Sequence, residues 1–220
     1  DTAAAEQTVT IASTGSDADI WRHIATLPET KAAGLKLDIK NFTDYVAMNT
    51  AVANNEVDVN AFQSYAYLVA YNEANTAKIA PLSTPYLEPM GIYSSKVKTL
   101  AEFKNGATIA IPNDGANESR ALLLLQSAGL VKLKNDFDFV KGTSKDIVEN
   151  NKALVIKPIQ MATAVRVKDE VDAIVLGNTL AMEGGLNVLK DAIYYEPIDQ
   201  TTKMNVNILA VAEARQNDPV

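Results

Sequence analysis

The chain has 220 residues but no cysteine and a single histidine, His23. Without cysteine it cannot form disulfides, thiolate nucleophiles or zinc–sulfur sites. With one imidazole it cannot build a metal site from several histidines, and we expect neither a metal nor a cofactor. The motifs of serine hydrolases, phosphate-binding loops and zinc proteases are missing from the sequence as well, which argues against an enzyme.

Basic residues and long apolar runs are also in short supply. The 20 Lys and Arg are outnumbered by 27 Asp and Glu, which gives a net charge of −7. Such a chain is repelled by nucleic-acid phosphates and by anionic membrane surfaces, so we expect no nucleic-acid partner. No apolar run approaches the roughly 20 residues of a membrane-spanning helix. Hydrophobic residues nevertheless make up 47% of the chain, which predicts a globular protein with a well-buried core.

Strand-like apolar runs alternate with helix-like segments along most of the chain. This alternation predicts an α/β fold with mostly parallel sheets. The expected strands are 8–12, 35–42, 57–61, 90–94, 108–111, 155–159, 173–176, 192–195 and 206–211. The expected helices are 17–26, 45–54, 62–74, 100–103, 117–128, 147–149, 162–168 and 178–182.

Two zones of turn-forming residues predict a division into two lobes. Residues 81–89 contain three prolines, and residues 194–203 contain Pro197 and a polar tail. If the chain crosses between lobes at both zones, residues 1–88 and 196–220 form lobe I and residues 89–195 form lobe II. A ligand is then expected in the cleft between the lobes.

The segment 107–129 carries the clearest candidate for a binding site. It predicts a buried strand, a turn, and a helix that begins near Asn117, so that Arg120 lies in the first helical turn. A cation there opposes the positive end of the helix dipole, whereas an anion is favoured. An Arg can hold a carboxylate through two parallel hydrogen bonds. We interpret Arg120 as the clamp for a ligand's carboxylate; the alternative is a surface Arg or an ion pair with Glu118 or another acid.

Several long strings of residues point to a family. Seven strings occur in this order along the chain: FTDY (42–45), VDVNAFQ (57–63), EPMGIYS (88–94), AIPND (110–114), RALLLL (120–125) followed by AGL (128–130), DIVEN (146–150) and GLN (185–187). With these strings the chain resembles the methionine-binding lipoproteins of the MetQ/NlpA family, the extracytoplasmic substrate-binding components of ABC importers. The resemblance runs from about Val9 to Val211.

The resemblance implies the two-lobed periplasmic-binding-protein fold, of a type II-like kind, and a set of ligand-binding residues. Arg120 matches the arginine that binds the ligand's α-carboxylate, and Tyr45 matches a pocket aromatic. Gln63 and Tyr67 lie where the family's FQHKPY string lines the cleft. Asn178 matches a polar residue of the family's pocket. No catalytic residue and no metal ligand is implied.

The chain departs from the family pattern at positions that face the ligand. After Gln63 the family's His-Lys-Pro is replaced by Ser64, Tyr65 and Ala66, and the Tyr that usually follows Asn178 is Leu180. We include Ser64 and Tyr65 among the expected ligand contacts. These departures extend the expected ligands from methionine to related amino acids and short peptides.

Each candidate also has a structural interpretation that the sequence leaves open. Asn178 follows a predicted strand and is equally suited to cap a helix. Tyr45, Tyr65 and Tyr67 can form the walls of an apolar slot or pack on amphipathic helices. Glu88 is either a partner for the ligand's ammonium group or an acid that bridges the lobes.

The leading functional hypothesis is a non-enzymatic binding protein that captures its ligand by cleft closure. It is expected to act as a monomer that delivers the ligand to the membrane subunits of an importer. We expect an extracytoplasmic location with a lipid anchor whose Cys is not in this chain, and we expect the family's C-terminal helices to be missing. An enzyme with paired acids, or a surface adhesin without transport function, remains the alternative.

Overall fold

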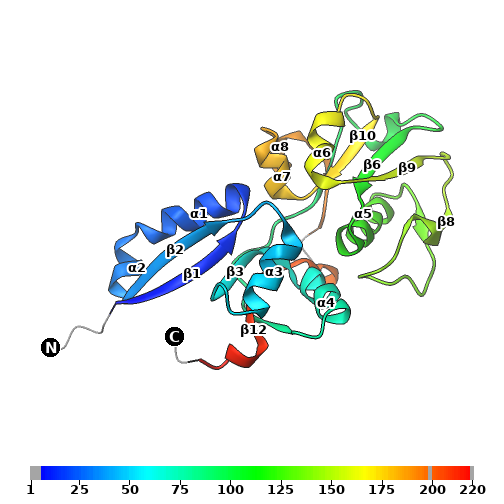
Figure 1. Cartoon of the computed structure of the whole chain (residues 1–220). Helices are drawn as coiled ribbons and strands as arrows, with labels where there is room; N and C mark the ends of the chain where they lie inside the picture. Colours follow the sequence, from blue (N-terminus) through cyan, green and yellow to red (C-terminus); the bar gives the residue numbers. More distant parts are fainter. Residues whose placement is uncertain (1–5, 198–199, 219–220) are drawn as a thin grey trace. The chain divides into compact units, whose positions relative to one another are not determined.

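The computed structural model describes residues 6–197 and 200–218. The chain forms two compact units (Figure 1). Unit 1 contains the described residues up to Leu87 and from Val206 onward, and unit 2 is Glu88–Asn205. The sequence boundary assigned the chain from residue 196 onward to lobe I, whereas unit 2 extends to Asn205 and the Glu196 side chain is buried.

Unit 1 is built on a five-stranded sheet in the order β2-β1-β3-β12-β4. Strands β1, β2 and β3 are parallel, whereas β12 is antiparallel to both β3 and β4. The carboxyl ends of β1, β2 and β3 therefore lie at one edge of the sheet. The strands are β1 (Gln7–Ser13), β2 (Leu35–Asn41), β3 (Val59–Ser64), β4 (Ile79–Ser83) and β12 (Asn207–Ala212).

Each of the three parallel strands of unit 1 leads into a helix at that edge. The helices are α1 (Gly15–Ala25), α2 (Pro28–Ala32), α3 (Tyr45–Ala53) and α4 (Tyr65–Ala74), and a 3₁₀ turn η5 (Glu213–Arg215) follows β12. Asp44 caps α3 by accepting from the Ala47 amide at 2.8 Å, and Ser64 caps α4 by accepting from the Tyr67 amide at 3.2 Å.

Unit 2 repeats this plan with a sheet in the order β11-β5-β10-β6-β9. Strands β10, β6 and β9 are parallel, and β5 is antiparallel to both β10 and β11. Each sheet thus contains one antiparallel strand, which agrees with the prediction of mostly parallel sheets. The strands are β5 (Gly91–Tyr93), β6 (Thr108–Pro112), β9 (Val155–Ile159), β10 (Ala173–Leu176) and β11 (Ala192–Tyr195), with β7 (Lys132–Leu133) and β8 (Ile147–Glu149) forming a separate pair.

Helix α5 supplies much of the core of unit 2. Its apolar face buries Leu122, Leu124 and Leu125 against the Ile109 and Ile111 side chains of β6. The α-helices are α5 (Gly115–Ser127), α6 (Met161–Ala164), α7 (Asn178–Glu183) and α8 (Val188–Asp191). Short 3₁₀ helices occur at η1 (Leu100–Glu102), η2 (Ser144–Asp146), η3 (Val165–Val167) and η4 (Gln200–Asn205).

Several expected elements differ in type or bounds in the structure. The helix expected at 147–149 is strand β8, because it pairs with β7. The helix expected at 62–74 begins only at Tyr65, since residues 62–64 continue strand β3. Helix α5 begins at Gly115 and is capped by Asp114 rather than Asn117, so Arg120 lies in its second turn.

Two prolines lie inside edge strands. Pro81 is in β4, within the zone that the sequence indicated as a turn region, and Pro158 is in β9. Both strands lie at an edge of their sheet, where the missing N–H of proline is tolerated. In the described part of the chain, no helix is both long enough and apolar enough to cross a membrane.

Candidate functional site

Several polar residues of unit 2 meet at one edge of its sheet. Gly91 of β5 pairs with Leu176 of β10 and with Tyr195 of β11, so the start of β5 lies beside the ends of both neighbours. The residues just before β5 and just after β11 are therefore close to the carboxyl ends of the parallel strands. In open α/β sheets this is the edge at which ligands bind.

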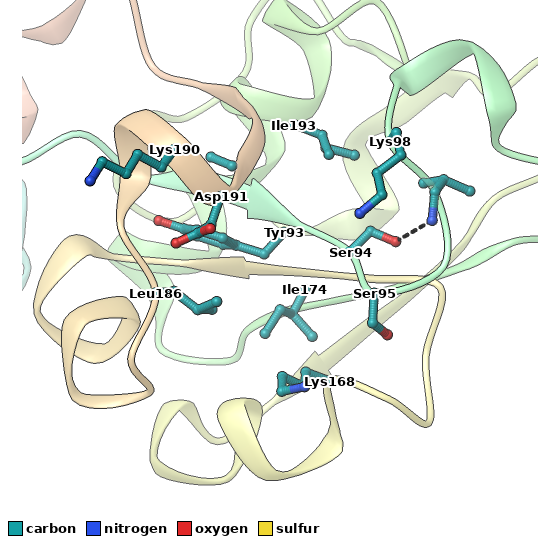
Figure 2. Close-up of a pocket in the computed structure, with 12 residues that line it drawn as sticks. Tyr93, Ser94, Ser95, Lys98, Lys168, Ile174, Leu186, Lys190, Asp191 and Ile193 are labelled. Atoms are coloured by element: carbon teal, nitrogen blue, oxygen red, sulfur yellow. Dashed lines mark hydrogen bonds between the residues drawn. The ribbon is translucent and has the colours of Figure 1, made fainter.

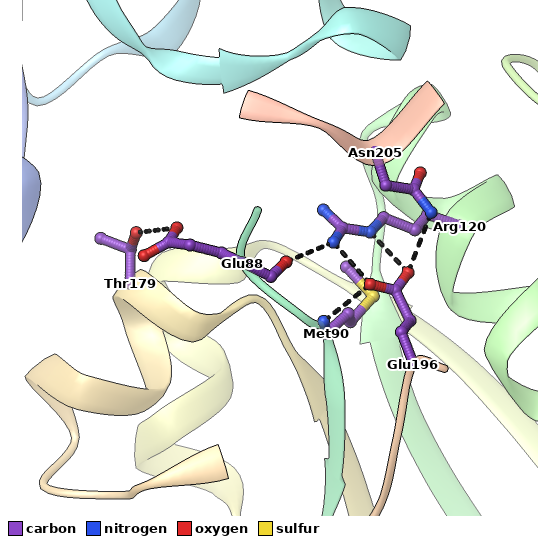
Figure 3. A network of polar contacts seen from close by, with 6 residues as sticks. All are labelled: Glu88, Met90, Arg120, Thr179, Glu196 and Asn205. Atoms are coloured by element: carbon purple, nitrogen blue, oxygen red, sulfur yellow. Dashed lines mark hydrogen bonds and ion pairs between the residues drawn. The ribbon is translucent and has the colours of Figure 1, made fainter. Parts of the chain in front are cut away.

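The centre of this edge is a buried ion pair between Arg120 and Glu196 (Figure 3). Arg120 donates from Nε to Glu196 Oε1 at 2.7 Å and from Nη2 to Oε2 at 2.6 Å. The two side chains are only 9% and 7% exposed. The sequence left open that Arg120 forms an ion pair with Glu118 or another acid. The structure shows such an ion pair, and the acid is Glu196.

The ion pair is joined by neighbouring backbone and amide groups. Arg120 Nη2 also donates to the Glu88 carbonyl at 2.7 Å. The carboxylate of Glu196 accepts from the Met90 amide at 2.9 Å and from Asn205 Nδ2 at 3.1 Å. Four hydrogen bonds therefore converge on the Glu196 carboxylate, which has about four acceptor positions. Within the described residues, Nη1 is the guanidinium nitrogen of Arg120 that has no hydrogen-bond partner.

A second group of contacts surrounds the Glu88 side chain (Figure 3). Asn178 Nδ2 donates to Glu88 Oε1 at 3.1 Å, and Thr179 Oγ1 donates to Oε2 at 3.2 Å. Asn178 is the first residue of α7, and the capping position belongs to Gly177. Glu88 contacts Arg120 through its carbonyl and Asn178 through its carboxylate, so the structure brings these two predicted site residues together around one residue.

Two further acids lie at the N-terminal end of helix α5. Burial raises the pKa of the Asp114 carboxyl, although hydrogen bonds from the side chain and amide of Asn117 offset part of the rise. Burial also raises the pKa of Glu118, and the negative charges of Asp114 and Asp146 act in the same direction.

In unit 1 the predicted aromatic residues form one cluster. The Tyr45 ring, at the start of α3, lies 5.3 Å from the ring of Phe62 and 6.2 Å from that of Tyr67. Phe62 and Tyr67 are 5.6 Å apart in an edge-to-face arrangement. The sequence interpretation missed Phe62, and its signal is the aromatic position near the carboxyl end of β3, directly before Gln63.

The remaining candidates of unit 1 have different surroundings. Tyr65 is 38% exposed at the start of α4, and the Ser64 hydroxyl is occupied in capping that helix. Gln63 is only 2% exposed. Its Nε2 donates to Asn49 Oδ1 at 2.7 Å and to Asn60 Oδ1 at 2.8 Å, so both N–H groups are engaged inside the unit.

Two cavities lie apart from the predicted site residues. One, of about 330 Å³, is lined in unit 2 by Tyr93, Lys98 and Asp191 among others (Figure 2). The Tyr93 hydroxyl is buried with no hydrogen-bond partner among the described residues, and burial together with Asp191 raises the pKa of Tyr93 to about 12. The other, of about 520 Å³, is a mainly apolar cavity in unit 1 lined by residues including Trp21. No group of acids and histidines suited to a metal ion occurs in the described residues.

Comparisons with known proteins identify relatives over most of the chain. The NlpA lipoprotein family matches residues 9–220. Outer membrane lipoprotein 2 of Mannheimia haemolytica is 38% identical over 186 residues, which are 84% of this chain and 66% of that protein. The probable D-methionine-binding lipoprotein MetQ of Pasteurella multocida is 36% identical over 188 residues, covering 84% of this chain and 67% of that protein. The chain therefore spans about two thirds of the length of these curated relatives.

Solved structures share the fold. A nutrient-binding protein from Burkholderia cenocepacia bound to methionine aligns with a TM-score of 0.89 at 34% identity, covering 96% of this chain and 87% of that chain. This likeness, together with the two α/β units, confirms the predicted fold class of a two-lobed binding protein.

Proposed function

Because the chain belongs to the NlpA lipoprotein family, we propose that it is an extracytoplasmic substrate-binding protein that captures methionine or a related amino acid for an ABC importer. Relatives named as D-methionine-binding lipoproteins, and a relative bound to methionine, support this assignment. We propose binding without turnover, because the relatives of this chain are named for the ligand that they bind.

The observation that carries the proposal is the Arg120 guanidinium. It is held at the edge of a mostly parallel sheet where α/β proteins bind ligands, and its Nη1 has no hydrogen-bond partner among the described residues, so that it can donate to a carboxylate oxygen. Asn178 lies nearby on α7 and supplies an amide that can turn to a polar group of an amino acid. These residues of unit 2 provide the polar recognition.

The aromatic cluster of unit 1 suits the side chain of such a ligand. Tyr45, Phe62 and Tyr67 present ring faces and edges within 6.2 Å of one another. Aromatic rings make favourable contacts with thioether sulfur as well as with aliphatic groups. We therefore propose these three rings as contacts for methionine or a similar apolar side chain, with Tyr65 and Ser64 at their margin.

The test is titration calorimetry of the purified chain with L-methionine, D-methionine and a panel of other amino acids. Arg120→Ala is expected to weaken binding of a carboxylate ligand by about 3 kcal/mol, because a buried charged donor is lost. Arg166→Ala is the matched control, since Arg166 is exposed in the same unit. Unchanged affinity in a folded Arg120→Ala protein would contradict the assignment of Arg120.

Arg120→Ala also leaves Glu196 buried without its partner, so the variant must be checked for folding by circular dichroism. If it does not fold, Phe62→Ala provides the second test. This change removes one ring of the cluster and is expected to lower methionine affinity roughly tenfold, while glycine affinity changes little. Equal losses for methionine and glycine would argue against the aromatic slot.

A further inference from the structure

The contacts of Glu196 point to a role in selecting the charge of the ligand. We propose that Glu196 is a positioning residue that orients and neutralises Arg120, so that the site favours ligands without net charge over anionic ones. This inference rests on the proposed function and adds the charge class of the substrate.

Orientation follows from the geometry of the ion pair. Glu196 engages Nε and Nη2 of Arg120 side by side, which fixes the plane of the guanidinium. The Glu88 carbonyl takes a second hydrogen bond from Nη2. Within the part of the chain that the structure describes, Nη1 is the guanidinium nitrogen without a hydrogen-bond partner. A ligand carboxylate is therefore expected to approach Arg120 from the side of Nη1.

Glu196 is itself held in place by the ends of the sheet. Its backbone amide donates to the Met90 carbonyl at 2.9 Å, and its carboxylate accepts from the Met90 amide at 2.9 Å. Asn205 holds the other oxygen at 3.1 Å. With its acceptor positions filled, the carboxylate has little freedom to move away from Arg120.

Among the described residues that make these contacts, the two acids Glu196 and Glu88 outnumber the one base, Arg120. Arg120 and Glu196 cancel, and Glu88 adds one negative charge that is hydrogen-bonded by the neutral groups of Asn178 and Thr179. A lone arginine would attract any small anion. The Arg120–Glu196 pair carries no net charge, so it can donate hydrogen bonds to a carboxylate without attracting every small anion. A ligand whose ammonium group offsets its carboxylate charge is less repelled by Glu196 and Glu88 than an anionic ligand is.

The first experiment compares ligands of different charge by titration calorimetry. Wild type and Glu196→Gln are titrated with L-methionine, which is zwitterionic, and with N-acetyl-L-methionine, which is anionic at pH 7. Removing the Glu196 charge is expected to weaken methionine binding roughly tenfold. It is also expected to reduce the ratio of the methionine affinity to the N-acetylmethionine affinity by roughly tenfold or more. The acetyl group adds the same bulk in wild type and in Glu196→Gln, so a change in the ratio of the two affinities between these proteins reports the effect of charge.

Glu170→Gln is the matched control, because Glu170 is exposed in the same unit and its loss is expected to leave the ratio unchanged. An unchanged ratio in Glu196→Gln would overturn the inference, even if both affinities fell, because a purely structural role would weaken both ligands alike. A reduced ratio in Glu196→Gln alone supports it.

The second experiment does not depend on a ligand. The chain contains four arginines, so the Nε–H region of a ¹⁵N spectrum holds four signals, and Arg120→Lys identifies the one from Arg120. This signal is expected to exchange slowly with solvent in wild type and at least roughly tenfold faster in Glu196→Gln, because the amide presents one acceptor where the carboxylate presents two. An equal exchange rate would overturn the orienting role. If wild type binds no amino acid of the panel, the proposed function fails, and this exchange rate alone decides whether Glu196 orients Arg120.

Discussion

The buried amides around Gln63 allow a sharp test of what this residue does. Asn49, Asn60 and Gln63 are at most 2% exposed. Gln63 Nε2 supplies two hydrogen bonds to the amide oxygens of the two asparagines, at 2.7 and 2.8 Å, and Asn49 Nδ2 returns one to Gln63 Oε1 at 3.1 Å. Gln63→Glu keeps the shape of the side chain but replaces the donor nitrogen by an oxygen, which faces two amide oxygens.

The expected loss of stability depends on pH. When the introduced carboxyl is protonated, its O–H can satisfy one amide oxygen, so one hydrogen bond is lost at a cost of about 1–3 kcal/mol. Ionisation would bury a charge against two acceptors, so the folded-state pKa rises above the unfolded value of about 4.3. The folded state then binds more protons than the unfolded state, and the free energy of unfolding falls by up to about 1.4 kcal/mol per pH unit from about pH 4.3 upward.

Urea unfolding followed by circular dichroism at pH 4, 5.5 and 7 measures this dependence. Gln63→Met removes the same hydrogen bonds without adding a charge and is expected to show a loss that does not vary with pH. Gln216→Glu is the control for an added surface charge, because Gln216 is exposed. If Gln63→Glu differs from wild type by the same amount at all three pH values, the description of Gln63 as an enclosed donor is refuted, and an accessible ligand-contacting amide becomes the better interpretation.

Two further predictions concern the core of unit 2. Leu122→Ala is expected to lower the free energy of unfolding by about 3–5 kcal/mol, because the Leu122 side chain is 0% exposed. The control Leu189→Ala should change it by less than about 0.5 kcal/mol, because Leu189 is 73% exposed. Equal losses for the two variants in urea unfolding would contradict the argument from burial. The pKa of Tyr93, raised to about 12 by burial and by Asp191, predicts that an absorbance titration at 295 nm contains a step near pH 12 that is missing in Tyr93→Phe. Since the folded state holds the Tyr93 proton longer than the unfolded state, this group should lower stability between about pH 10 and 12, and Tyr93→Phe should remove that part of the alkaline loss.

Much of the fold could be predicted from the sequence, because the apolar runs and turn-forming residues agree with the strands and helices of the structure. The alternation of apolar runs located β9, β10 and β11 at the residues expected. Strand β4 was missed because Pro81 indicates a turn, and only its position at a sheet edge makes the proline acceptable there. Residues 147–149 formed a strand because a partner, β7, was available, which no local pattern reveals.

The candidate site was readable in part. Family strings led to Arg120 and Asn178, which the structure joins through Glu88, and to Tyr45 and Tyr67, which meet in one aromatic cluster. The partner of Arg120 could not be identified from spacing, because it lies 76 residues away in the chain. Ligand contact by these residues stays a prediction until binding is measured.

The prolines in the outer strands also bear on how the protein behaves at high local concentration. An open strand edge offers unpaired N–H and C=O groups to any extended segment of another molecule. Pro81 in β4 and Pro158 in β9 each delete one such donor from an outermost strand. Each sheet consequently has one edge strand along which the strand of another molecule cannot form an unbroken ladder of hydrogen bonds. This should disfavour intermolecular β-sheets when many copies of the protein are crowded together.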